Sequence, residues 1–141
     1  MSLYVLDTDI VSLFQHDDAA VAASVQRHPI EELAITVLTV EEQLSGWYNE
    51  LRKAKKPAIL AAVYQQMALT VQFLGHLPIL SFTEPAIKRY EALQELKLKV
   101  KKTDLRIAAI VLEQNAVLVT RNARDFSRVP GLRIEDWSKP K

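Results

Sequence analysis

Short apolar runs alternate along this chain with longer segments whose apolar residues recur every three to four positions. A short apolar run is typical of a buried strand, and the longer spacing is typical of a helix with one apolar face. The runs predict strands at residues 3–6, 33–37, 77–82, 116–120 and 132–134. The spacing predicts helices at about residues 10–15, 17–27, 39–56, 57–75, 84–98 and 104–114.

Strands that alternate with helices favour a parallel sheet, because each parallel crossover needs a connection of helical length. We therefore predict an α/β fold with a central parallel sheet of about four to five short strands and helices on both faces. The chain has 141 residues, shows no linker or low-complexity tract, and is expected to form a single domain over residues 1–141.

The amino-acid composition argues against several kinds of functional site and of targeting segment. The chain contains no cysteine, which excludes disulfides, thiolate catalysis and cysteine zinc sites. No apolar run reaches the roughly 18 residues that a membrane span needs. The first residues, MSLYVLD, lack the basic segment of a signal peptide. We therefore expect a cytoplasmic protein that makes no membrane contact.

The net charge of +1 conceals two oppositely charged halves. Residues 1–87 carry 5 Lys+Arg and 10 Asp+Glu, whereas residues 88–141 carry 13 Lys+Arg and 7 Asp+Glu. A basic half on a small domain favours an anionic partner that touches part of the surface. A chance difference between solvated helix faces is the alternative interpretation.

Acidic side chains follow several of the predicted strands. Asp7 follows the first strand, Glu41 and Glu42 lie just after the second, and Asp125 lies in the loop after residues 116–120, while Asp104 opens the preceding helix. Sites in open parallel sheets form beyond the carboxyl ends of the strands, so these acids are expected to gather there. Clustered carboxylates repel, and oxygen-only ligands favour Mg²⁺ or Mn²⁺. Such a cluster suits phosphoryl chemistry.

Each acid also has a structural interpretation. Asp7 and Asp104 fit helix N-termini, where acids are favoured, and Thr39 with Glu42 matches a capping box. The apolar stripe of the helix from residue 39 puts Glu41 at its margin and Glu42 nearly opposite. By helical geometry alone, Glu41 and Glu42 are both candidates for the residue that faces the site.

Four segments carry a resemblance to a known family. They are LDTD at residues 6–9, TVEEQLSG at 39–46, TDLRIAA at 103–109, and LVTRNARDF at 118–126, which continues to Trp137. In this order they resemble the motifs of PIN domains, and the last stretch is similar to VapC-like ribonuclease toxins of type II toxin–antitoxin systems. The resemblance implies a metal-dependent endoribonuclease that cleaves RNA phosphodiester bonds by metal-activated water and is held inactive by a small antitoxin protein.

Carried over by position, the family's acids fall on Asp7, Glu42, Asp104 and Asp125 as catalytic residues. Asp7, Asp104 and Asp125 resemble the ligands of Mg²⁺ or Mn²⁺. Supporting positions are Asn122, Thr120 and Asp9, of which Asn122 stands where some relatives have an acid and Asp9 where many have Asn. The family spacing to Gly46 selects Glu42 over Glu41.

Basic residues flank these acids, and we expect some of them to neutralise RNA phosphates: Lys101, Lys102, Arg106, Arg121 and Arg124. The large residues between Val40 and Gly75, including Trp47 and Tyr64, predict a homodimer that also accepts an antitoxin. Two other functions compete. One is a haloacid-dehalogenase-like phosphatase using Asp7 and Asp9, and the other is a catalytically inactive PIN-like module that binds RNA or protein.

Overall fold

The computed structural model describes residues 2–140 of the chain. Within that range the strands are β1 (Tyr4–Leu6), β2 (Leu33–Thr36), β3 (Ile79–Leu80), β4 (Val117–Val119) and β5 (Arg133–Glu135). The helices are α1 (Thr8–Gln15), α2 (Ala19–Gln26), α3 (Val37–Lys53), α4 (Pro57–Leu74), α5 (Glu84–Glu95), α6 (Lys102–Glu113) and α7 (Ala123–Phe126), with a 3₁₀ turn at Ile30–Glu32.

The five strands form one parallel sheet in the order β3-β2-β1-β4-β5. Chain order runs outward from β1 to β3 on one side and from β4 to β5 on the other. The topological switch point therefore lies between β1 and β4, where Leu6 pairs with Val119. This arrangement confirms the predicted α/β fold class and fixes where a site is expected.

Helices cover both faces of the sheet, as predicted, and each face has its own core. Successive strand residues point to opposite faces. Val5 and Leu118 accordingly pack in the cluster that includes α5 and α6, whereas Leu6 and Val119 pack with α1, α2 and Trp137. The same pairing that aligns β1 with β4 thus ties the two cores together beneath the strand ends.

Several predicted boundaries are wrong. The helices expected over residues 39–56 and 84–98 end early, at Lys53 and Glu95. The strand expected at residues 77–82 is reduced to β3, and a short helix, α7, lies in the segment expected to be a loop. The helix expected to open at Thr39 begins at Val37, because the Thr36 hydroxyl caps it by accepting a hydrogen bond from the Thr39 amide at 3.3 Å. Thr39 is therefore not an N-cap, and the capping box with Glu42 does not form.

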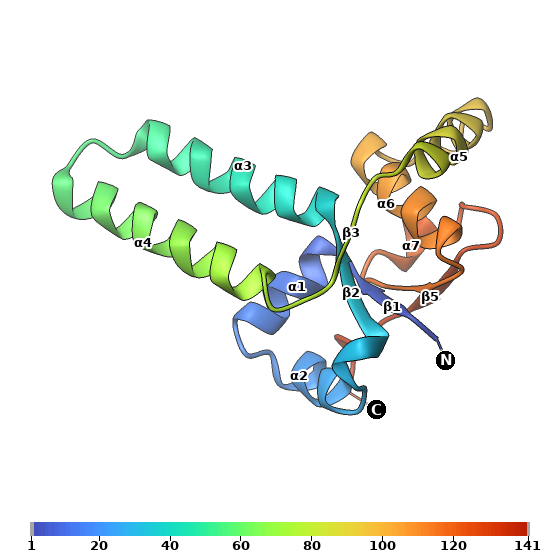
Figure 1. Ribbon diagram of the computed structural model, residues 1–141, viewed down its shortest axis with the longest axis horizontal. Helices are drawn as coiled ribbons and strands as arrows, with labels where there is room; N and C mark the ends of the chain where they lie inside the picture. The colour runs from blue at the N-terminus through green and yellow to red at the C-terminus, as the bar shows by residue number, and fades with distance from the viewer. Residues whose placement is uncertain (1, 141) are drawn as a thin grey trace.

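Helices α3 and α4 form a hairpin that projects from the body of the molecule, side by side along its length (Figure 1). Most of its apolar surface has no cover within the described chain. The exposed large residues on this hairpin are Val37, Tyr48, Ile59, Tyr64, Leu69 and Val71. Only Val63, Thr70 and Leu74 of α4 are buried. The apolar face of the hairpin is thus larger than its own packing uses.

Helix α4 is also long and apolar enough to cross a bilayer, judged by length and composition alone, with a mean hydropathy of 1.2. The expectation that no segment reaches this length does not hold by that measure. One such helix is weak evidence of a span, because helices of soluble folds meet the same criterion. The absence of membrane contact stays a prediction.

Candidate active site at the strand ends

A pocket of about 320 Å³ opens beyond the carboxyl ends of β1 and β4. Four carboxylates and two lysines line it, together with an asparagine and parts of α1, α6 and α7. The charged and amide residues are Asp7, Asp9, Glu42, Asp104, Lys101, Lys102 and Asn122. The pocket lies at the topological switch point, and it brings together side chains as far apart in the chain as Asp7 and Phe126.

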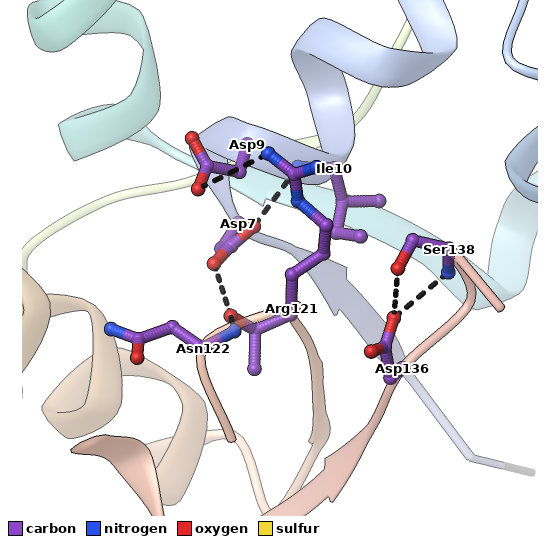
Figure 2. Close-up of polar contacts among 8 residues, drawn as sticks. Asp7, Asp9, Ile10, Arg121, Asn122, Asp136 and Ser138 are labelled. Atoms are coloured by element: carbon purple, nitrogen blue, oxygen red, sulfur yellow. Dashed lines mark hydrogen bonds and ion pairs between the residues drawn. The ribbon is translucent and has the colours of Figure 1, made fainter. Parts of the chain in front are cut away.

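Asp7 is the most deeply placed of these acids, with 7% of the residue exposed. Its amide continues the sheet by donating to the Val119 carbonyl at 3.0 Å, so the backbone of β4 fixes its position. One carboxylate oxygen caps α1 by accepting from the Ile10 amide at 3.0 Å (Figure 2), and the other accepts from the Thr120 hydroxyl. The capping interpretation of Asp7 is confirmed, and capping still leaves the carboxylate lining the pocket.

The environment makes Asp7 difficult to ionise. Burial raises the pKa of Asp7 to about 6 from 3.8, more than the hydrogen bonds from Thr120 and Ile10 lower it. The nearby Asp9 and Asp104 add to the rise. With a pKa of about 6 Asp7 is largely ionised at neutral pH and takes up a proton in mild acid, and a positive charge close by would lower its pKa.

Asp104 lies in the first turn of α6, across the pocket from Asp7. Burial raises the pKa of Asp104, and the neighbouring Glu42 raises it further, followed by Asp125 and Asp9, while Lys101 lowers it. The three segments that carry Asp7, Glu42 and Asp104 are therefore close enough for their charges to interact. This mutual repulsion is what we expect where carboxylates share a cation.

Glu42, and not Glu41, lines the pocket. The Thr8 hydroxyl donates to a Glu42 carboxylate oxygen at 2.6 Å and lies 3.0 Å from the Thr39 hydroxyl. Because α3 begins at Val37, Glu42 lies in its second turn, where the helix runs past the first turn of α1. Thr8 therefore joins the start of α1 to α3 and holds Glu42 at the mouth of the pocket.

Asp125 lies in the first turn of α7 and is not among the lining residues. Its two carboxylate oxygens accept from the Asn122 side chain at 3.1 Å and from Arg128 at 3.2 Å. Asn122 lines the pocket, and its backbone amide donates to the Thr120 hydroxyl oxygen at 2.9 Å. A line of hydrogen bonds thus runs from Asp7 through Thr120 and Asn122 to Asp125.

Asp9 is exposed at the pocket edge, and its carboxylate lies 3.9 Å from the Arg121 guanidinium (Figure 2). This ion pair is solvated, since the two side chains are 63% and 49% exposed. A pair of this kind contributes little to stability, so both groups remain available to other partners.

The predicted RNA-binding residues divide into two groups. Lys101 and Lys102 line the pocket, and Arg121 and Arg124 are exposed beside it. Arg106 lies elsewhere, with its guanidinium carbon 5.2 Å from the ring centre of Tyr90 and 5.9 Å from that of Phe82. Its buried Nε has no hydrogen-bond partner within residues 2–140. The pocket therefore offers no support for the prediction that Arg106 contacts RNA.

The donor set fits a hard divalent cation in kind, since the pocket presents carboxylate, amide and hydroxyl oxygens and neither His nor Cys. Across the described residues 2–140, no three Asp, Glu or His side chains already stand as a ready-made metal-binding group. Glu42 is turned toward Thr8 and Asp125 toward Arg128. Binding an ion would therefore require these side chains to rotate inward.

Two contributors escaped prediction from the sequence. Thr8 directly follows Asp7, but only the three-dimensional contact with α3 reveals its bond to Glu42. Arg128 lies three positions after Asp125, a spacing that suits contact within one helical turn and could have identified it. Thr8 has no sequence signature that distinguishes it from an ordinary residue at the start of a helix.

Comparison with known proteins decides the family. The family model for the PIN domain matches residues 4–132. The chain belongs to the PIN domain family. As predicted from its motifs, it is similar to VapC proteins. It is 30% identical over 143 residues to Ribonuclease VapC2 of Rickettsia felis, covering 97% of this chain and 99% of that protein.

Two further matches extend this relationship. A tRNA(fMet)-specific endonuclease VapC of Salmonella typhimurium is 36% identical over 77 residues, which cover 52% of this PIN domain and 58% of that protein. The crystal structure of DNA-bound VapBC from Salmonella typhimurium superposes with a TM-score of 0.79 at 25% identity, covering 97% of this chain and 99% of that one. The family match leaves the haloacid-dehalogenase alternative without support.

The raised pKa of Asp7 predicts how the stability of the metal-free PIN domain changes with pH. Between pH 3.8 and about 6 the folded state binds more protons than the unfolded state. Stability therefore falls as the pH rises through this window, by up to about 3 kcal/mol from Asp7. Asp7→Asn is expected to flatten this dependence. Denaturant unfolding from pH 4 to 7.5 measures it, and equal slopes in the two proteins would contradict it.

Proposed function

We propose that this PIN domain is a VapC-like, divalent-metal-dependent endoribonuclease that acts as the toxin of a toxin–antitoxin pair. The observation that carries the proposal is the pocket between β1 and β4, where Asp7, Glu42 and Asp104 converge with Lys101 and Lys102. Acidic and positively charged side chains line the same pocket. A divalent cation complements the acids, and the lysines complement a phosphodiester backbone.

Asp7, Asp104 and Asp125 are the proposed ligands of Mg²⁺ or Mn²⁺, with Asn122 and Asp9 in support. When bound, such an ion supplies Lewis-acid polarisation of the phosphate and lowers the pKa of a water molecule. The raised pKa values of Asp7 and Asp104 support this assignment. Burial, and to a lesser extent the neighbouring acids, disfavour their charged forms, and a bound cation would favour those forms. Asp7 contributes the most rigid ligand, since its position is fixed by the sheet.

The chain's own residues would orient the substrate and its attacking water. Thr120 keeps Asp7 facing the pocket, and Thr8 holds Glu42 at the mouth, where its carboxylate would position the water or accept a proton. Lys101 and Lys102 line the same pocket and would hold the phosphate of the scissile bond. Arg121 and Arg124 lie beside it and would neutralise flanking phosphates.

Assembly with a partner is the second part of the proposal. The similar Salmonella structure is of DNA-bound VapBC, and we infer a small antitoxin partner for this chain. The α3–α4 hairpin supports a homodimer as well, because Tyr48, Tyr64 and Leu69 are 53%, 56% and 49% exposed. Apolar area of this extent is costly to leave in water, and Tyr is enriched at interfaces. The expected location is the cytoplasm.

The first prediction from this function concerns Asp104. Asp104→Asn is expected to abolish divalent-dependent RNA cleavage, because it removes a proposed ligand. It should leave the stability of the metal-free protein unchanged or higher, because it also removes repulsion from Glu42. Cleavage of a labelled RNA with Mn²⁺ and with chelator measures the effect, and Glu91→Gln on exposed α5 serves as control. Undiminished cleavage by the folded variant would remove Asp104 from the site.

The second concerns the lysines. In the Asp104→Asn background, which is expected to bind RNA without cleaving it, log K for RNA should fall linearly with log salt. Replacing Lys101 and Lys102 by Gln should reduce that slope by about 0.7 per lost phosphate contact. Lys55→Gln with Lys56→Gln, at the far tip of the hairpin, is the matched control pair. An unchanged slope would assign Lys101 and Lys102 to the solvated surface.

The third concerns assembly. Light scattering at tens of micromolar is expected to show a dimer, because exposed apolar hairpin surface is buried on pairing. Tyr64→Asp should weaken it, whereas Ile87→Asp, on exposed α5, should not. Mixing with the protein encoded by an adjacent short reading frame should give a larger complex. A strict monomer that forms no such complex would refute both parts.

A further inference from the structure

Arg128 joins two segments that frame the pocket from outside. It follows α7, and its Nη1 donates both to the Lys99 carbonyl at 3.0 Å and to an Asp125 carboxylate oxygen at 3.2 Å. Lys99 and Arg128 are 29 positions apart, so this contact links the connection between α5 and α6 to the loop after β4. No other side chain in the described residues bonds to the Lys99 carbonyl.

The segment on the Lys99 side has an unusual backbone. Lys97 and Lys99 have φ values of 51° and 61°, a left-handed conformation that side chains other than glycine seldom adopt. Leu98 and Val100, between and after them, pack against the core beneath α5 and α6. Strained residues persist only where surrounding contacts hold them, and the Arg128 bond is one such contact. Two residues later the same segment delivers Lys101 and Lys102 to the pocket.

On the other side, hydrogen bonds connect Asp125 to Asp7, the most buried of the acids. Asp125 accepts from Asn122, the Asn122 amide donates to Thr120, and Thr120 donates to Asp7. Arg128 therefore stands at the outer end of a continuous line of hydrogen bonds. Its other contact is with the Lys99 carbonyl, and Lys99 lies just before the pocket lysines in the chain.

We propose that Arg128 is a positioning residue that keeps the Asp125 carboxylate and the Lys99–Lys102 segment in a fixed relation across the pocket. The proposal rests on the proposed ribonuclease function. In it Arg128 touches neither the RNA nor an ion, and it acts through Asp125 and through the backbone of Lys99. Its ion pair is partly solvated, with side chains 37% and 32% exposed, so it contributes little to global stability. The contact acts locally, by restricting the motion of the Asp125 side chain and of the Lys99–Lys102 segment.

A direct role is the rival explanation. If Arg128 contacted an RNA phosphate, Arg128→Gln would weaken RNA binding and reduce its salt slope, and its effect would add to that of Asp125→Asn. A positioning role predicts a lower kcat with a smaller change in KM, and effects of the two substitutions that are not additive. The two explanations therefore differ in the salt slope of RNA binding, in the relative changes of kcat and KM, and in the additivity of the two substitutions.

The first arm of the test uses the metal-free protein without RNA. Hydrogen exchange of Arg128→Gln should show faster exchange at amides of both residues 97–101 and residues 122–126, with little change in global unfolding. Arg133→Gln is the matched control, because Arg133 also donates to a backbone carbonyl, that of Asn115 at 2.7 Å, but at the opposite end of the sheet. The control should leave both segments unchanged.

The second arm measures RNA cleavage by Arg128→Gln, Asp125→Asn and the double variant under single-turnover conditions. Arg128→Gln should reduce the rate about 10-fold or more, as removal of a supporting partner commonly does. In the Asp125→Asn background the reduction should be smaller, because the contact through Asp125 is already changed there. Arg128→Lys keeps the charge and should recover part of the rate and of the exchange protection. This variant also tests the proposal if Arg128→Gln does not fold.

The outcomes are separable. Unchanged exchange in both segments, or additive effects with a reduced salt slope, would overturn the positioning role. Failure of the wild-type protein to cleave any RNA would count against the proposed function alone, because the exchange arm needs no substrate. Faster exchange confined to one segment would also overturn the proposal, since Arg128 would then not couple the two sides.

Discussion

The burial of Asp7 at the junction of β1 and β4 is the constraint on which the rest of the site depends. Its amide belongs to the sheet, one carboxylate oxygen caps α1, and the other accepts from Thr120. These bonds hold the carboxylate in a place where burial raises its pKa to about 6. The fold thereby fixes a carboxyl group where it is hard to ionise, which is costly unless a cation or a proton compensates it.

The other acids reach this point from separate elements, and two of them are held by partners of their own. Thr8 holds Glu42, and Arg128 with Asn122 holds Asp125. The two lysines enter from a strained connection between α5 and α6. Among the described residues neither pocket lysine forms an ion pair with a pocket acid, an arrangement that suits a metal-bound phosphodiester.

Much of this architecture could be predicted from the sequence, because short apolar runs between amphipathic segments specify a parallel sheet and its strand ends. The positions of Asp7 and Asp104 followed from that pattern. The start of α3 did not, because Thr36 and Thr39 are equally good caps by composition and only the chain path from β2 selects Thr36. The orientation of Arg106 did not follow either, because flanking sequence cannot show that its side chain lies against Tyr90. Thr8 and Arg128 act through contacts between distant segments, which spacing does not reveal.

The central claim is that the buried carboxylates form one cation site. It is tested most directly by the protons released when Mn²⁺ binds the metal-free protein, from titration calorimetry in buffers of different ionisation enthalpy. Asp7 and Asp104 have raised pKa values, so binding near pH 6 should release a measurable fraction of a proton, and binding at pH 7.5 should release less. Asp7→Asn should reduce the release at pH 6. Binding with no proton release at either pH, or no binding, would contradict the account.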